Sequence, residues 1–336
     1  MTELRIGVAG VGSLGFHHAR ILRDVEGVAM AGFFEPRIHR ATEVSTELEI
    51  PSHSSLEALL DQVDALVVAA PTTHHREIAE AALRRGIHTF IEKPIAPTLG
   101  EADAILEAAR ASGAVVQTGH VERFNSAILA AETYLDEPLF IESHRLAPFV
   151  NRGTDVAVIL DLMIHDVDLV QALVGTPIED IAATGIPVLT PSVDIANARL
   201  TFRGGAVANL TASRVSLERM RKLRVFQRSG YLSLNLAEGT GEFLRLRGTL
   251  PALGGEDGEF SLSELGTVAN LEDIVERIPL KGDKVEPLRR ELESFRDAAL
   301  GLRAPVVSGW DGREALSVTL SIQTLIEKHV ADSRTS

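Results

Sequence analysis

The chain has 336 residues, of which 45% are hydrophobic and 24% are charged, and its net charge is −14. This length predicts two domains and this composition is typical of folded globular proteins. The charge excludes a general nucleic-acid-binding surface, which needs a basic face, and the lack of cysteine excludes disulfides, thiol catalysis and cysteine-ligated metals. No signal-peptide pattern and no apolar run of about 20 residues is present, so a cytoplasmic protein without a membrane partner is expected.

Strand-like and helix-like segments alternate along the chain as far as His120. The stretch LRIGVAGVGSLGFHHARIL predicts a strand, a glycine-rich turn and a helix, and the next strand, VAMAGFF, ends at Glu35. Later strands are predicted in VDALVVAAPT, IHTFIEKP and AVVQTGH, with helices between them. This alternation predicts an α/β fold with an N-terminal Rossmann domain, a doubly wound parallel sheet, over residues 1–122.

The pattern changes after Arg123. Helices are predicted at 124–135 and 156–174, and clustered strands without intervening helices predict a C-terminal α+β domain over residues 123–336. Its sheet should be large, open and mostly antiparallel, with helices on one face. The expected strands lie in the segments FIESHRLAP, IAATGIPVL, IANARLTF, AVANLTASRV, LRVFQRSG and YLSLNL. Beyond them, an exposed insertion is expected at 251–285 and closing amphipathic helices at 286–300 and 312–330.

The glycines at positions 10, 12 and 15 form a G-x-G-x-x-G motif between the first strand and its helix. Gly10 permits the tight turn, Gly12 lets the backbone approach a pyrophosphate, and Gly15 allows close helix–strand packing. The helix N-terminus, where Ser13 and Leu14 lie, would donate N–H groups to the phosphates. These residues are the predicted centre of a dinucleotide site.

Glu35 lies about 20 residues beyond the glycine motif, where a carboxylate accepts hydrogen bonds from the adenosine ribose. Its charge would repel a 2′-phosphate, so the sequence favours NAD as the cofactor. Arg37 and Arg40 lie close by and leave NADP as the alternative. Arg37 is included in the predicted cofactor site.

Two further segments end at the same edge of the predicted sheet. In AAPTTHH, Pro71, Thr72 and His75 are predicted to contact the cofactor, although both histidines of the segment could instead be surface residues at a helix N-terminus. In FIEKP, Glu92 and Lys93 follow a strand, so the lysine should project into the nucleotide crevice. The alternative is a solvated lysine at a strand end.

The apolar stretch ILDLMIHDVDLV carries an Asp and a His four residues apart, Asp161 and His165. On a helix they share one face, and an imidazole with a pKa near 6.5 suits proton transfer at neutral pH. We predict that His165 is the base, that Asp161 orients it, and that Lys93 stabilises alkoxide character; Lys93 as the base is the competing assignment. No third ligand is placed for a metal, so none is expected.

The remaining residues of this stretch divide into two groups. Leu160, Met163, Ile164 and Val167 fit a buried stripe. Asp168 is interpreted as structural. Asp166 is left open between a structural role and a contact with substrate.

In their order, G-x-G-x-x-G, AAPTTHH, IEKP, GHVERFN and D-x-x-x-H resemble the glucose–fructose oxidoreductase / inositol dehydrogenase family of NAD(P)-dependent dehydrogenases. The resemblance covers essentially the whole chain. It implies a Rossmann domain and a substrate-binding domain whose open sheet carries the interface of a homodimer or homotetramer. It also implies that Lys93 contacts the reacting hydroxyl and the cofactor ribose, that Asp161 and His165 complete the catalytic set, and that a cis peptide precedes Pro94.

Arg123 and Asn125 match the family's R-F-N segment, which implies that they bind substrate. A narrower resemblance, in LDLMIHDVDLV and NLTASRVSLERMRKLRVFQ among others, is to a bacterial branch that oxidises the 3-hydroxyl of UDP-N-acetylglucosamine for lipid A synthesis. Its pyrophosphate would need cationic partners. The candidates are Arg123, Arg145, Arg214, Arg219, Arg221, Lys222 and Arg224.

Three alternatives stay open at this point. The first is a dehydrogenase of an inositol or another hexose. The second is an NADPH-dependent imine or keto reductase. The third is a non-catalytic NAD-binding regulator on the same fold.

Overall fold

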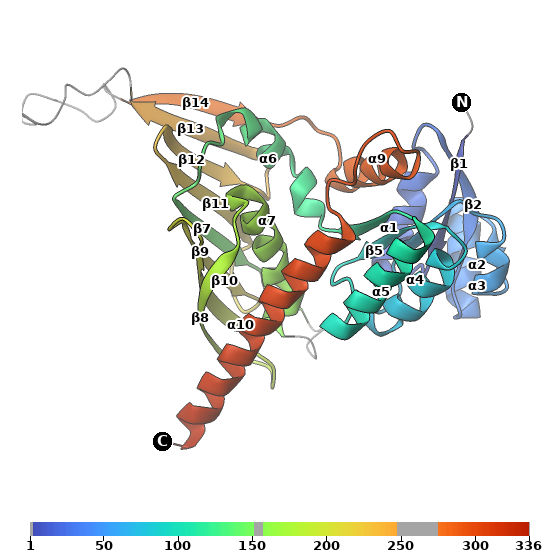
Figure 1. Cartoon of the computed structure of the whole chain (residues 1–336), viewed down its shortest axis with the longest axis horizontal. Helices are drawn as coiled ribbons and strands as arrows, with labels where there is room; N and C mark the ends of the chain where they lie inside the picture. Colours follow the sequence, from blue (N-terminus) through green and yellow to red (C-terminus); the bar gives the residue numbers. More distant parts are fainter. Residues whose placement is uncertain (1–2, 151–156, 247–274, 336) are drawn as a thin grey trace, which may run out of the picture.

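The computed structural model describes residues 3–150, 157–246 and 275–335, which form two layered units (Figure 1). The N-terminal unit is a parallel six-stranded sheet of order β3-β2-β1-β4-β5-β6. The order reverses direction between β1 and β4, as in doubly wound nucleotide-binding sheets. Its strands are β1 (Leu4–Ala9), β2 (Val28–Phe34), β3 (Ser52–His53), β4 (Ala65–Val68), β5 (His88–Glu92) and β6 (Val116–Gly119).

Helices cover both faces of this sheet. The central strand β4 is buried at every position, as expected for a parallel strand packed on two sides. The side chains of Ser55 and Thr98 accept hydrogen bonds from the first turns of their helices and so fix where those helices begin. The helices are α1 (Ser13–Leu22), α2 (Ile38–Leu48), α3 (Leu56–Leu60), α4 (His75–Leu83) and α5 (Leu99–Ser112). The predicted Rossmann domain is confirmed.

The second unit contains an eight-stranded sheet of order β14-β13-β12-β11-β7-β10-β9-β8. Every neighbouring pair is antiparallel except β10 and β7, so the predicted, mostly antiparallel sheet is confirmed. Its strands are β7 (Phe140–Leu146), β8 (Ile178–Ile186), β9 (Ile195–Phe202), β10 (Val207–Ser213), β11 (Met220–Gln227), β12 (Gly230–Asn235), β13 (Thr240–Leu246) and β14 (Val275–Lys281).

Of the insertion expected at 251–285, residues 251–274 lie outside the described part of the chain. The end of the segment is not an exposed insertion: β14 pairs with β13 along the edge of the large sheet. Ile278 and Leu280 are more buried than Arg277, Pro279 and Lys281 beside them, which is the pattern of a half-buried strand.

Three helices lie on one face of the large sheet: α6 (Ser126–Ala131), α7 (Ile164–Val174) and α10 (Gly309–Thr335) (Figure 1). They bury the core formed by inward side chains of the strands. The segment predicted as one helix at 156–174 begins, in its described part, with a π-helical turn, Ile159–Met163, before α7. Such turns are often found at functional sites.

The C-terminal helices return to the N-terminal unit. On α9 (Pro287–Ala299), Leu292 and Phe295 join the core around β1, and the rings of Phe90 and Phe295 lie 5.7 Å apart. The helix α10 serves both units, because Leu316 packs into the N-terminal core and Ile322 into the core of the large sheet. The predicted division at residues 122/123 did not anticipate this return.

None of the described helices is both long and apolar enough to cross a bilayer.

Candidate active site

A pocket of about 1320 Å³ opens between the two units at the carboxyl edge of the N-terminal sheet. The N-terminal unit lines it with the glycine loop, the end of β2, the turn after β4 and the end of β5. The second unit adds Asp161, Leu162, His165 and Arg221. Pockets for one small ligand typically measure about 300–1000 Å³, so this one has room for a cofactor and a second ligand.

The glycine loop fits a dinucleotide. Gly10 has a φ of 89°, and a Cβ on Gly15 would lie 1.9 Å from the Gly10 carbonyl oxygen, so neither position accepts a side chain. A Cβ on Gly12 would meet only the tip of Arg37, at 3.8 Å, so its backbone faces open pocket. The first turn of α1 has no acidic residue and no side-chain cap, which leaves its N–H groups available to a pyrophosphate. Ser13 and Leu14 line this part of the pocket.

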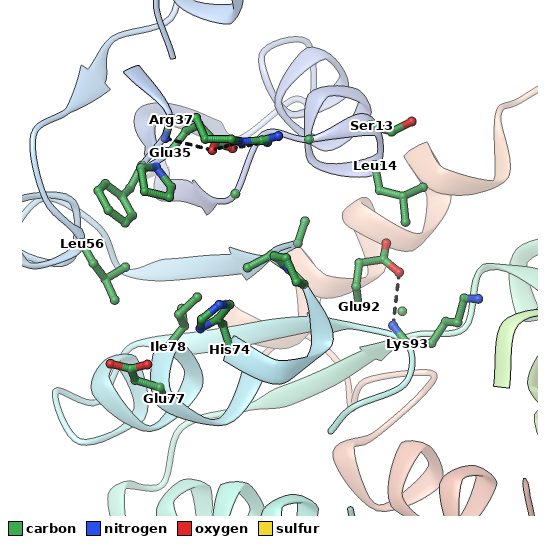
Figure 2. Close-up of a pocket in the computed structure, with 18 of the residues that line it drawn as sticks. Ser13, Leu14, Glu35, Arg37, Leu56, His74, Glu77, Ile78, Glu92 and Lys93 are labelled. Atoms are coloured by element: carbon green, nitrogen blue, oxygen red, sulfur yellow. Dashed lines mark hydrogen bonds and ion pairs between the residues drawn. The ribbon is translucent and has the colours of Figure 1, made fainter. Parts of the chain in front are cut away.

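Glu35 ends β2 beside the same loop, and Figure 2 shows its carboxylate against Arg37. Arg37 Nε donates to Glu35 Oε1 at 2.7 Å, and the Val11 N–H donates to Oε2 at 3.1 Å. Burial alone would raise the pKa of Glu35, but these hydrogen bonds lower it below its usual range. The carboxylate is therefore ionised at neutral pH and disfavours a 2′-phosphate. Arg40 donates to the Val11 carbonyl at 2.9 Å and so supports the loop.

The turn after β4 contributes Pro71 and His74 to the pocket, whereas Thr72 and His75 do not line it. The buried ring of His75 lies 2.9 Å from the Ala70 carbonyl oxygen and 3.1 Å from that of Pro94. His75 therefore joins two turns behind the pocket wall, where burial lowers its pKa. The cofactor contact predicted for His75 is corrected to a supporting position, and the contact predicted for Thr72 stays a prediction.

Lys93 lies at the end of β5, next to a cis peptide bond that joins it to Pro94. Its ammonium donates to the Asp161 carbonyl oxygen at 2.7 Å and lies 3.8 Å from Asp161 Oδ1. Burial lowers the pKa of Lys93, and the charges of Asp161 and Glu92 oppose that shift. The adjacent Glu92 is buried and accepts the Lys93 N–H (Figure 2). Its carboxylate lies 2.6 Å from the ring of His18.

His165 faces the same pocket from α7. Its ring packs edge-on to His120 with centroids 6.3 Å apart, and its Nδ1 has no hydrogen-bond partner among the described residues. Burial, together with the charges of Lys93 and Arg145, holds the pKa of His165 well below its usual value, so the imidazole is neutral at pH 7. The structure brings Lys93, Asp161 and His165 together. The Asp161 carboxylate, however, faces Lys93, which corrects the expectation that it orients His165.

Arg123 and Asn125 do not line the pocket. Arg123 makes a two-pronged ion pair with Asp168, at 2.7 and 2.9 Å. The Asn125 amide donates to Glu122 and to the Leu236 carbonyl, and its oxygen caps α6. Their predicted role as substrate ligands is corrected, because these polar groups are already paired within the protein. The pairing of Asp168 agrees with its structural interpretation.

A second ion-paired cluster was not predicted. Arg145 is buried and donates to Asp166 at 2.7 and 3.0 Å and to Glu122 at 2.8 Å. Glu122 also accepts from Arg221, at 3.4 Å. The only sequence signal for Glu122 is its place in the GHVERFN segment. Asp166 was left open between a structural role and a contact with substrate, and its pair with the buried Arg145 favours the structural role. In the described part of the chain, no three His, Asp or Glu side chains are arranged to hold a metal ion.

Comparisons with known proteins agree with this architecture. Residues 4–120 match the model of an oxidoreductase family with an NAD-binding Rossmann fold, and residues 127–233 match the Gfo/Idh/MocA C-terminal domain. The UDP-N-acetylglucosamine 3-dehydrogenase of Acidithiobacillus ferrooxidans is 35% identical over 97% of this chain and 98% of its own length. A solved structure of that enzyme superposes with a TM-score of 0.86 at 34% identity, covering 98% of this chain and 99% of its own.

A second relative is the scyllo-inositol 2-dehydrogenase (NAD(+)) of Bacillus subtilis, 28% identical over 64% of this chain and 68% of its own. Its name gives NAD as the cofactor and scyllo-inositol as the substrate of that enzyme. The chain belongs to the Gfo/Idh/MocA family of NAD-dependent oxidoreductases.

Proposed function

We propose that the protein oxidises the 3-hydroxyl of UDP-N-acetylglucosamine to the 3-keto sugar, with NAD as the hydride acceptor. The observation that carries the proposal is the meeting of Lys93 and His165 in one pocket with the glycine loop. The full-length similarity to an enzyme of that name supports the choice of sugar.

The residues divide the chemistry of alcohol oxidation between them. His165 is neutral and lines the pocket, so its imidazole can take the hydroxyl proton. Lys93, held by the Asp161 carbonyl at 2.7 Å, places a positive charge where alkoxide character develops. When bound, NAD would supply the acceptor for the hydride that leaves the carbon bearing this hydroxyl. Asp161 positions the lysine, and the first turn of α1 and Glu35 would hold the cofactor.

Two alternatives are kept. Lys93 is the competing base, because burial lowers its pKa and so favours the uncharged amine that can accept a proton. A neutral cyclitol is the competing substrate, since inositol dehydrogenases are among the relatives.

The experiment follows NADH absorbance with UDP-N-acetylglucosamine, scyllo-inositol and myo-inositol as substrates. UDP-N-acetylglucosamine is expected to reduce NAD. The variant Lys93→Ala should lower kcat by at least about 10²- to 10³-fold while NADH binding, measured by fluorescence, stays within about twofold. Turnover with an inositol but none with UDP-N-acetylglucosamine rejects the proposed sugar, and wild-type turnover in Lys93→Ala rejects the assigned role of the lysine.

We also propose that the protein is a cytoplasmic homo-oligomer built on the uncovered face of the large sheet. The described helices of the second unit lie on the opposite face (Figure 1). Phe140, Phe226 and Tyr231 form an aromatic row on three adjacent strands, with ring centroids 5.7 and 4.6 Å apart, and Phe226 is exposed. Such a patch is typical of an interface. Light scattering should give a dimer or tetramer, and Phe226→Asp should lower the mass; a monomeric wild type rejects this part.

A further inference from the structure

The structure selects one arginine from the basic run between residues 219 and 224. On β11, Arg221 lies opposite Arg145 of β7, and the next residue on the same side, Leu223, is fully buried. Lys222 and Arg224 alternate to the outer face, where Arg224 lies 3.5 Å from Glu142. Of the described arginines of the second unit, Arg221 alone lines the pocket that holds Lys93 and His165.

The neighbours of Arg221 orient its guanidinium but leave most of its N–H donors without a hydrogen bond to any described residue. Its contact is with Glu122 Oε1, at 3.4 Å, and that same oxygen accepts a shorter bond, 2.8 Å, from Arg145. The second Glu122 oxygen accepts from Asn125. Arg221 is therefore a minor partner in a cluster that is already paired, and 41% of its side chain is exposed. A guanidinium has five N–H donors, so several remain for a ligand.

The charge around Arg221 also favours an anion. Burial lowers its pKa, Glu122 opposes that shift, and the positive charges of Arg145 and Arg219 add to it. Arginine stays protonated at neutral pH all the same. The positive charge of Lys93 faces the same pocket. A negative group between the two units would offset this positive potential.

We infer that Arg221 binds the diphosphate of a nucleotide-linked sugar and so selects anionic substrates over neutral cyclitols. The inference rests on the proposed function and deepens it. The planar guanidinium matches phosphate oxygens two at a time, and the partly covered site strengthens the contact relative to open water. Lys93 and His165 would then receive the sugar while Arg221 holds the diphosphate linked to it. A neutral inositol has no group that needs this residue.

The test compares Arg221→Gln and Arg221→Lys with a matched control, Arg224→Gln, on the outer face of the same strand. Steady-state kinetics with UDP-N-acetylglucosamine are measured, together with inhibition by UDP at saturating NADH, which keeps UDP out of the cofactor site. In Arg221→Gln, KM and the UDP inhibition constant should rise about 10- to 100-fold, the loss expected for charge-assisted hydrogen bonds. The value of kcat should change less than about threefold, and NADH affinity should stay constant.

The other variants complete the design. Arg221→Lys keeps the positive charge but loses the planar guanidinium, so KM and the UDP inhibition constant should rise less than in Arg221→Gln. Arg224→Gln should behave as wild type. The KM of the wild type should increase with salt, and this dependence should weaken in Arg221→Gln. Values of KM and UDP inhibition within twofold of wild type in both Arg221 variants overturn the inference. If Arg221→Gln does not fold, Arg221→Lys and the salt dependence decide it.

A failure of the proposed sugar can be told apart from a failure of this inference. If the wild type oxidises an inositol but not UDP-N-acetylglucosamine, the proposed sugar is wrong, and UDP binding to the NADH-loaded enzyme is then measured by calorimetry. Binding that weakens in Arg221→Gln supports a diphosphate site, and no binding to the wild type overturns it.

Discussion

Glu291 provides a sharp test of the buried electrostatics behind the pocket. It lies on α9, is fully buried, and neither carboxyl oxygen has a hydrogen-bond partner among the described residues. Burial raises the pKa of Glu291 well above its usual value, and the negative charges of Glu92 and Asp168 raise it further. The folded protein therefore holds a proton on this side chain, while the unfolded chain releases it near pH 4.3.

The consequence is a stability that falls as pH rises. Above about pH 5 the unfolded state has lost this proton and the folded state has not, so the carboxyl costs about 1.4 kcal/mol of unfolding free energy for each further pH unit. The loss ends once pH passes the pKa of the folded state. The variant Glu291→Gln keeps the size and neutrality of the protonated acid, and its advantage over wild type should therefore grow by about 1.4 kcal/mol per unit in this window.

Urea unfolding of wild type and Glu291→Gln between about pH 5 and pH 8 measures the difference. All other titrating groups are common to both proteins and cancel. The variant Glu293→Gln is the control, because that residue lies on the same helix with its side chain 36% exposed. Parallel stability curves for wild type and Glu291→Gln would refute the reasoning, since they would mean that Glu291 titrates alike in both states.

Three further outcomes are expected. Gly15→Ala places a Cβ 1.9 Å from the Gly10 carbonyl oxygen, so it should cost about 1–3 kcal/mol in thermal unfolding and weaken NADH binding more than tenfold. Gly12→Ala should weaken NADH binding without a loss of stability. Equal stability losses in the two variants would contradict this contrast. Arg145→Met removes the ion pair of the buried Asp166 and the shorter of the two arginine contacts of Glu122, and should cost about 3–5 kcal/mol in urea unfolding; a loss below about 1 kcal/mol would be inconsistent with the observed pairing. Because the pKa of His165 is depressed, the acid limb of kcat/KM should lie below pH 6.5, and a limb at or above that value would exclude His165 as the base.

The parts of the structure that sequence reasoning predicted well are those set by local patterns. The glycine motif follows a strand and opens a helix, and the buried run at Ala65–Val68 has the composition of a central parallel strand. Alternating polarity in Ile195–Phe202 likewise marks a strand with one buried face. All three signals depend only on residues near one another in the chain, so the two sheets could be predicted.

Contacts between distant segments could not be predicted in this way. The return of α9 to the N-terminal core depends on tertiary packing of Leu292 and Phe295, and their spacing is that of any amphipathic helix. The R-F-N segment suggested contacts with a ligand, but Arg123 instead pairs with the carboxylate of Asp168 on α7. Which side Arg221 faces depends on the pairing of β11 with β7, which no local pattern specifies.

The helix that carries His165 shows how a single apolar segment can hold four polar residues. Each has its own surroundings: Asp161 meets Lys93 across the pocket, Asp166 and Asp168 each pair with an arginine, and His165 faces open space. Pairing offsets the cost of burying the two inner carboxylates and ties the helix to its neighbours. His165 lines the pocket without an ion pair, and burial keeps its imidazole neutral. The ion pairs therefore hold the helix in place, and the neutral imidazole is the group that this helix offers for proton transfer.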